Sequence, residues 1–168
     1  MTMYMFGYGS LIFSPGINGR GMDHTYTEND LTVTSLKGYQ RCWNTEWDDI
    51  LYLGLIKSDC HFVNGVIFPV DPEDAQPLLD SEGIYDSPPM YTLEDVTELI
   101  DKPSIIKSED RIFTCVTENP TAKGKIKPYY INIIRSGLIT RGKKFKHEFI
   151  ETTFPNMPEG YYNHDYKS

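Results

Sequence analysis

A short apolar strand that runs into a glycine-rich turn opens this chain and constrains its fold most. The strand is expected over Tyr4–Phe6, and the whole segment reads Met5-Phe6-Gly7-Tyr8-Gly9-Ser10-Leu11-Ile12. Glycine tolerates positive φ and places no side chain over the main chain, so a ligand can approach the backbone closely. Successive N–H groups in such a turn can form an anion-binding nest. The opening predicts either a site for a small acidic ligand or a plain turn between two strands.

Nucleotide-binding loops do not fit this opening. A dinucleotide fingerprint needs a third glycine and a helix that starts directly after the turn. Here Gly9 is followed by Ser10-Leu11-Ile12-Phe13 and then by Pro15. No Gly-Lys-Ser/Thr sequence follows either, which excludes a P-loop.

The composition predicts one folded domain. Of the 168 residues, 39% are hydrophobic and 24% are charged, which is enough to build a core. We expect the domain to span residues 1–153 and residues 154–168 to form a C-terminal tail without a clear period. The formal net charge of −8 argues against nucleic acid as a partner, because clustered Lys and Arg drive that contact.

The chain shows no sign of a membrane segment, a metal site or a bound cofactor. No apolar run approaches the length of a membrane span, and no signal peptide begins the sequence. Cys42, Cys60 and Cys115 are odd in number and contain no C-x-x-C, so we expect reduced thiols in a cytoplasmic protein. None of the four histidines lies at metal-ligand spacing from a cysteine or from another histidine. The sequence leaves open whether the protein is a monomer or a homodimer.

The first two-thirds of the chain has the pattern of β-strands. Alternating and β-branched residues between Gly, Pro, Asn and Asp punctuation predict strands at Tyr4–Phe6, Leu31–Leu36, Tyr39–Thr45, Leu51–Ile56, Val63–Val70, Tyr91–Leu99 and Arg111–Thr117. Trp43 and Trp47 fall on one face of a predicted strand, which is typical of core residues. The pattern indicates an α+β domain on a curved or barrel-like antiparallel sheet.

Three helical segments are predicted. The first has Asp71 as N-cap and Pro72 at the first position, stops near Gly83, and contains Pro77, which predicts a short or kinked helix. The second runs from Pro128 to Gly137. The third begins near Lys143 with Phe145 and Phe149 turned inward and basic residues outward. The basic stretch at 141–146 is interpreted as a solvated helix face.

One acidic residue stands out as a candidate for chemistry. Glu82 lies in Leu78-Leu79-Asp80-Ser81-Glu82-Gly83-Ile84-Tyr85, at the end of the first predicted helix. A carboxylate beside glycine at the mouth of an element is well placed to act as a general base. Many helices, however, end in a solvated acid before a glycine, so a simple capping role is the alternative.

Taken in order, several segments resemble the γ-glutamylcyclotransferase-like family. These are the Tyr8-Gly9-Ser10-Leu11 turn, Leu36-Lys37-Gly38-Tyr39, Gly65-Val66-Ile67-Phe68-Pro69-Val70 leading into Leu-Asp-x-Glu-Gly, and the late Pro128-Tyr129-Tyr130-Ile131-Asn132-Ile133-Ile134. The resemblance covers residues 4 to 140. The opening and Leu36-Lys37-Gly38-Tyr39-Gln40-Arg41 look most like the glutathione-degrading branch of the family.

The resemblance implies a small α+β fold with a partly closed mixed β-barrel and a few short helices. It implies a reaction that cyclises a γ-glutamyl group to 5-oxoproline and expels an amine, amino acid or peptide. Carried over by motif, Glu82 is the essential carboxylate, and Tyr8, Gly9, Ser10 and Leu11 hold the γ-glutamyl group. Tyr91 and Tyr130 match two further tyrosines of the family site, with Tyr85 and Tyr129 as rivals.

The chemistry accounts for these residue types. The substrate supplies its own nucleophile, because its α-amine attacks the γ-carbonyl to close a five-membered ring. Glu82 can remove a proton from the amine and return one to the leaving nitrogen if burial raises its pKa. No cofactor is required. A protein that holds a small ligand in the same pocket without turnover is the alternative.

Two departures from the glutathione-degrading branch leave the leaving group open. Ser81 stands where that branch has an Arg before the acid. The chain also has Thr45-Glu46-Trp47-Asp48-Asp49 in place of a basic, glycine-rich segment. Glutathione is therefore not predicted as the substrate. The acidic run either favours a cationic leaving amine or is a solvated surface segment.

Overall fold

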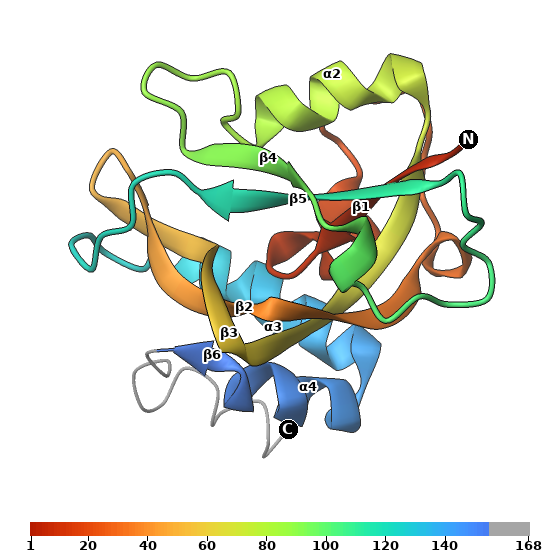
Figure 1. Cartoon of the computed structure of the whole chain (residues 1–168). Helices are drawn as coiled ribbons and strands as arrows, with labels where there is room; N and C mark the ends of the chain where they lie inside the picture. The colour runs from red at the N-terminus through yellow and green to blue at the C-terminus, as the bar shows by residue number, and fades with distance from the viewer. Residues whose placement is uncertain (155–168) are drawn as a thin grey trace.

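A long, bent β-hairpin organises the computed structural model, which describes residues 1–154 (Figure 1). Strand β2 (Thr32–Trp47) pairs antiparallel with β3 (Ile50–Val70) along almost its whole length. Asp48 and Asp49 make the connection with φ angles of 51° and 63°, as a two-residue turn between twisted strands requires.

Four separate strands are predicted between Leu31 and Val70. The structure has two long strands there instead, β2 and β3. Gly38 has a φ of 85°, and the pairing register shifts between Lys37 and Tyr39. A bulge of this kind bends the hairpin while the chain stays in the sheet. Glycine and polar residues that look like strand ends in the sequence are therefore points of curvature.

The sheet has six strands in the order β4-β5-β1-β3-β2-β6. Strand β1 (Met3–Gly7) lies inside it, antiparallel to β3 and parallel to β5 (Arg111–Thr117). The edges are β4 (Tyr91–Asp95) and β6 (Thr153–Phe154), which pair with β5 and β2 and not with each other. The predicted α+β class is confirmed. The sheet is mixed rather than antiparallel, and it is curved without closing into a barrel.

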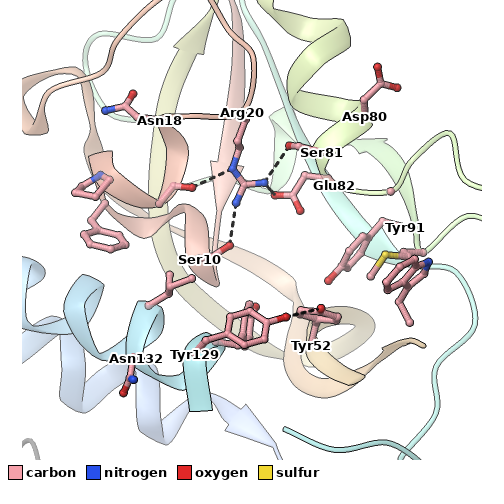
Figure 2. Close-up of a pocket in the computed structure, with 18 of the residues that line it drawn as sticks. Ser10, Asn18, Arg20, Tyr52, Asp80, Ser81, Glu82, Tyr91, Tyr129 and Asn132 are labelled. Atoms are coloured by element: carbon pink, nitrogen blue, oxygen red, sulfur yellow. Dashed lines mark hydrogen bonds and ion pairs between the residues drawn. The ribbon is translucent and has the colours of Figure 1, made fainter. Parts of the chain in front are cut away.

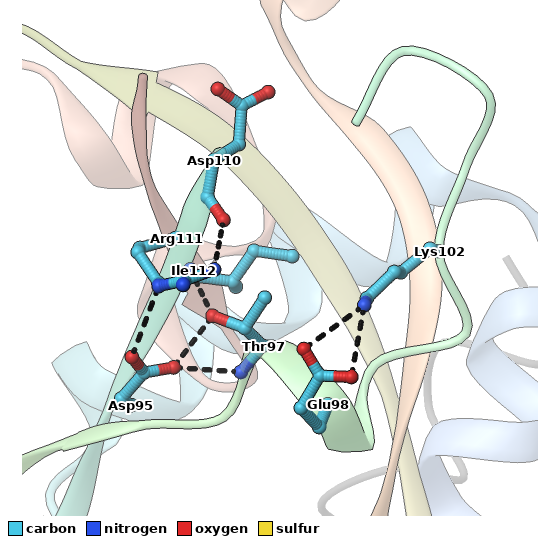
Figure 3. A network of polar contacts seen from close by, with 7 residues as sticks. All are labelled: Asp95, Thr97, Glu98, Lys102, Asp110, Arg111 and Ile112. Carbon is cyan, nitrogen blue, oxygen red and sulfur yellow. Dashed lines mark hydrogen bonds and ion pairs between the residues drawn. The ribbon is translucent and has the colours of Figure 1, made fainter. Parts of the chain in front are cut away.

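The strand predicted over Tyr91–Leu99 is shorter than expected. Strand β4 ends at Asp95, and a 3₁₀ turn, η3 (Thr97–Leu99), follows it. Thr97 explains this end, because its backbone N–H donates to Asp95 at 3.0 Å and its hydroxyl accepts from the N–H of Ile112 at 2.9 Å (Figure 3). A side chain thus takes the place of a strand partner and fastens the turn to β5.

The predicted helices are present with changed bounds. Helix α2 (Pro72–Ser81) lies beyond β4, and α3 (Pro128–Arg141) and α4 (Lys143–Glu151) lie against the β2–β3 hairpin (Figure 1). Helix α3 runs past Gly137, where the predicted helix stops. An added Cβ at Gly137 would meet Ile12 at 2.7 Å, so the glycine permits close packing at this point of the helix. The helix ends at Arg141 and is capped by Gly142, which has a φ of 98°.

The short segments after β1 complete the described structure. They are the 3₁₀ turns η1 (Ser10–Ile12) and η2 (Glu28–Asp30) and the one-turn helix α1 (Ser14–Ile17). Among residues 1–154, no helix is both long and apolar enough to span a bilayer. The predicted tail lies outside the described residues except for Phe154, which belongs to β6.

Two interpretations of the sequence are wrong in detail. Trp43 is buried, as expected, but Trp47 is 50% exposed, because a second register shift between Trp43 and Thr45 turns the end of β2. The basic stretch at 141–146 is not a fully solvated face. Lys146 is buried, and Arg141 is ion-paired with Glu28. Phe145 and Phe149 are buried as predicted.

Candidate functional site

The glycine-rich turn leaves β1 at the centre of the sheet and enters η1. A Cβ on Gly7 would meet the Leu11 carbonyl oxygen at 2.4 Å, so the turn folds tightly back on the strand end. A Cβ on Gly9 would lie 3.2 Å from the Tyr130 hydroxyl. Glycine at both positions therefore keeps the backbone close to its neighbours.

A buried arginine holds this turn from behind. Arg41, on β2, has no exposed surface, and its Nε donates to the Tyr8 carbonyl at 2.8 Å. Its other nitrogens donate to the Phe149 carbonyl at 3.1 Å, to Thr152 Oγ1 at 2.9 Å and to the Asn64 carbonyl. The guanidinium also lies 3.7 Å from the centre of the Phe149 ring. Arg41 therefore connects the turn to β3 and α4.

Glu82 caps the C-terminal end of α2 and faces the turn. Its N–H donates to the carbonyls of Leu78 and Leu79, both at 3.2 Å, and Gly83 follows with a φ of 74°. This reversal, which favours glycine, directs the chain away and leaves the Glu82 side chain 17% exposed. Glu82 therefore combines the two alternatives considered for it: its backbone caps α2, and its carboxylate points into the site.

Arg20 is a residue of this site that the sequence analysis missed. It follows α1 in a glycine-rich loop, and its guanidinium lies 3.4 Å from Glu82 Oε1 (Figure 2). It also donates to Ser81 Oγ at 3.0 Å, Ser10 Oγ at 3.2 Å and the Gly16 carbonyl at 3.0 Å. The one available signal was that Arg20 is the only arginine in the first forty residues. Its contacts depend on tertiary structure.

Burial and charge act in opposite directions on Glu82. Burial raises the pKa of the Glu82 carboxyl, and the positive charge of Arg20 lowers it, with burial the larger effect. The net result is a pKa above the ordinary value for glutamate. A carboxylate with these properties can take up a proton near neutral pH more readily than a solvated one.

Three tyrosines surround the carboxylate. Tyr8 donates its hydroxyl to the Cys115 carbonyl, and Tyr91 donates to the Leu53 carbonyl, both at 2.7 Å. Burial raises the pKa of the Tyr8 and Tyr91 hydroxyls, so both stay protonated donors. The Tyr130 ring packs edge-on against Tyr52, with ring centres 5.0 Å apart.

The predicted residues meet around one small inner chamber of about 30 Å³. All seven line it: Tyr8, Gly9, Ser10, Leu11, Glu82, Tyr91 and Tyr130. Of the two rivals, Tyr85 is 55% exposed and does not line the chamber, and Tyr129 lies farther out.

A larger outer cleft of about 960 Å³ adjoins the chamber (Figure 2). Ser10, Glu82, Tyr91 and Tyr130 line both spaces and so mark the junction between them. The outer walls carry residues that the sequence analysis did not assign to the site, among them Arg20, Trp47, Tyr52, Asp86 and Asn132. Within residues 1–154, no group of three or more His, Cys, Asp or Glu side chains is arranged to hold a metal ion.

Comparison with solved structures identifies the fold. A structure described as γ-glutamyl cyclotransferase superposes with a TM-score of 0.67 at 15% identity and covers 100% of both chains. The chain has the γ-glutamyl cyclotransferase fold. No protein-family model matches the sequence, and no curated protein matches it.

Two further structures share the γ-glutamyl cyclotransferase fold with this chain. An uncharacterised human protein aligns with a TM-score of 0.65 at 15% identity over 98% of both chains. A yeast γ-glutamyl cyclotransferase described as specific to glutathione aligns with a TM-score of 0.51 at 15% identity, over 90% of this chain and 95% of its own. The family resemblance seen in the motifs is thus confirmed at the level of the fold.

Proposed function

We propose that this chain cyclises the γ-glutamyl group of a small amide to 5-oxoproline and releases the amine. The observation that carries the proposal is the inner chamber, where motif residues from three separate segments of the chain line one space together with the Glu82 carboxylate. The fold, which a γ-glutamyl cyclotransferase also has, supports it. The substrate is a small molecule, and a cytoplasmic location is part of the proposal.

The reaction needs a proton carrier rather than a protein nucleophile. The substrate α-amine attacks the γ-carbonyl carbon, so that a new C–N bond closes the five-membered ring. Glu82 accepts the proton that the amine loses. When the original amide C–N bond breaks, Glu82 returns a proton to the departing nitrogen, which leaves as a neutral amine. The raised pKa of Glu82 suits both transfers, because the group must gain and lose a proton in each cycle.

The chamber and its junction would orient the substrate. With about 30 Å³ of space, the chamber has room for one end of the γ-glutamyl group, and the rest would lie at the junction beside Glu82. Ring closure requires the amine and the carbonyl carbon to be held in contact, and such positioning supplies several kcal/mol of the barrier. The hydroxyls of Tyr91 and Tyr130 and the Ser10 side chain offer polar contacts at that point.

Substitution Glu82→Gln tests the proposal. The amide keeps the size of the side chain and removes its ability to take up a proton, so we expect 5-oxoproline release to fall at least about 100-fold. Purified wild type and variant are incubated with a panel of γ-glutamyl amides, amino acids and glutathione, and 5-oxoproline is followed by mass spectrometry. Glu73→Gln, the same change on an exposed residue of α2, is the matched control and should retain full activity.

The outcomes separate an enzyme from a binding protein. Release by wild type and by Glu73→Gln, but not by Glu82→Gln, supports the proposal. Full activity of a folded Glu82→Gln protein would refute the role of Glu82. If wild type releases no 5-oxoproline from any compound and binds one of them unchanged, the protein is a non-catalytic ligand-binding protein.

A further inference from the structure

The outer cleft has an aromatic wall that the reaction at Glu82 does not use. It consists of Trp47 at the end of β2, Tyr52 on β3 and Tyr129 at the start of α3. Trp47 and Tyr129 are 50% and 51% exposed, and the Tyr52 and Tyr129 hydroxyls lie 2.9 Å apart (Figure 2). Large aromatic side chains that gather at the mouth of a cavity indicate a binding surface.

The cleft also carries an excess of negative charge. Among the described residues that line it, the carboxylates are Asp80, Glu82 and Asp86, and Arg20 is the only Lys or Arg. The charge of Arg20 is opposed by Glu82 at 3.4 Å. Burial and the hydrogen bond with Tyr129 raise the pKa of the Tyr52 hydroxyl, and the negative charge of Asp48, in the β2–β3 turn, raises it further. A group that enters the outer cleft therefore meets π-faces and carboxylates.

The position of Glu82 between chamber and cleft indicates which part of the substrate would lie in the outer cleft. Glu82, Tyr91 and Tyr130 line both spaces, so the bond to be broken would lie between chamber and cleft. The chamber is too small for a second group, and the cleft, at about 960 Å³, is as large as the sites of drug-sized ligands. The leaving amine would therefore extend from Glu82 toward the aromatic wall.

We propose that the outer cleft selects a leaving amine that carries a second, positively charged amino group at its far end, as in a diamine. This inference rests on the proposed function. Ammonium groups bind to the faces of Trp and Tyr rings, and the carboxylate of Asp86 at the rim adds a favourable charge. A leaving group that ends in a carboxylate would be repelled by the same residues, because the cleft offers no second cation among its described lining residues.

Three γ-glutamyl amides of matched length test the selection. Their leaving groups are 1,5-diaminopentane, n-hexylamine and 5-aminopentanoate, which end in an ammonium, a methyl and a carboxylate group. We expect kcat/KM for the diamine to exceed that for hexylamine by about fivefold or more, as a cation–π contact supports. The carboxylate compound should be the poorest of the three. The preference for the cation should shrink in 0.5 M NaCl, because exposed charges are screened.

Variants locate the selection in the cleft. Trp47→Leu and Asp86→Asn should each reduce the ratio of kcat/KM for diamine over hexylamine toward one. Phe62→Leu and Asp59→Asn are the controls, since both residues are exposed on β3 and neither lines the cleft. Phe62, at 48% exposed, matches Trp47 closely. Both controls should keep the wild-type ratio.

The possible failures are distinguishable. If wild type turns over all three amides without preferring the diamine, this inference is wrong and the proposed function stands. If wild type releases 5-oxoproline from none of these amides or of the broader panel, the proposed function fails and the inference with it. If the preference exists but survives both Trp47→Leu and Asp86→Asn, the outer cleft is not its source.

Discussion

The inner chamber and the outer cleft differ in how their side chains are held. Around the chamber, Tyr8 and Tyr91 are buried and each donates to a main-chain carbonyl at 2.7 Å. In the cleft, the Tyr129 hydroxyl pairs with another tyrosine side chain, and Trp47 is half exposed. Tyr8 and Tyr91 therefore support the fold as well as the site, whereas Trp47 and Tyr129, at the exposed wall of the cleft, can vary at little cost in stability. This difference fits the proposal that the chamber holds the reacting group and the cleft selects the leaving amine.

The largest effect on stability is expected from replacing Arg41, the arginine that holds the first turn from behind. Arg41→Met removes donors from the carbonyls of Tyr8, Phe149 and Asn64 and leaves them buried. We expect the free energy of unfolding to fall by about 3–5 kcal/mol, because a hydrogen bond to a charged group contributes about 1.5–3 kcal/mol and several are lost together. Urea denaturation followed by circular dichroism measures this loss.

Arg111→Met is its control, since the Arg111 side chain is 44% exposed and its partner Asp95 lies 3.9 Å away. Such a surface change should shift the free energy of unfolding by less than about 0.5 kcal/mol. A loss of the same small size for Arg41→Met would show that the chamber does not depend on this support.

Removing one tyrosine hydroxyl from the chamber and one from the cleft compares directly how much each region contributes to the free energy of unfolding. The expected loss is smaller than for Arg41→Met. Tyr91→Phe deletes the buried bond to the Leu53 carbonyl, and should lower the free energy of unfolding by about 1–2 kcal/mol. Tyr129→Phe deletes an exposed bond to Tyr52, and should change it by less than about 0.5 kcal/mol. Thermal and urea unfolding of both variants measure the difference. Equal losses would contradict the distinction between the two regions.

A change in the pH dependence of activity is expected from Arg20→Gln, next to the junction residue Glu82. Arg20 lowers the pKa of Glu82, so its loss should raise that pKa further. Since the ionised carboxylate accepts the proton, a higher pKa moves the acidic limb of the kcat/KM profile to higher pH. Activity should thus be lost at low pH and recovered as pH rises.

Arg20→Lys is the matched control, because it keeps the positive charge while losing the fixed geometry of the guanidinium. Its acidic limb should lie between those of wild type and Arg20→Gln. An unchanged limb in Arg20→Gln would mean that Arg20 does not act on the charge of Glu82.

Local sequence predicted the first turn and the helix end beside Glu82, because both are short motifs with strong local rules. The glycines of the first turn, the N-cap and proline that start α2, and the glycine after Glu82 each specify a backbone direction from adjacent residues. The resemblance then indicated which tyrosines to expect, and Tyr91 and Tyr130 both line the chamber. The roles proposed for these residues stay predictions until the variants are measured.

The curvature of the sheet was harder to predict. Polar residues and Gly38 look like strand ends, yet β2 and β3 continue through them, because the partner strand supplies hydrogen bonds that the local sequence cannot show. The parallel pairing of β1 with β5 likewise joins segments about a hundred residues apart. Strand propensity contains no information about such partners.

The sequence by itself determined the α+β class, the turn at residues 8–11 and the position of Glu82 at a helix end, since these follow from local periodicity, capping and glycine geometry. Tertiary structure alone decided that Arg20 reaches Glu82 and that Arg41 supports Tyr8. It also decided that a register shift turns Trp47 outward to join Tyr52 and Tyr129. Contacts between distant segments are set by how the whole chain packs, and no local pattern encodes them.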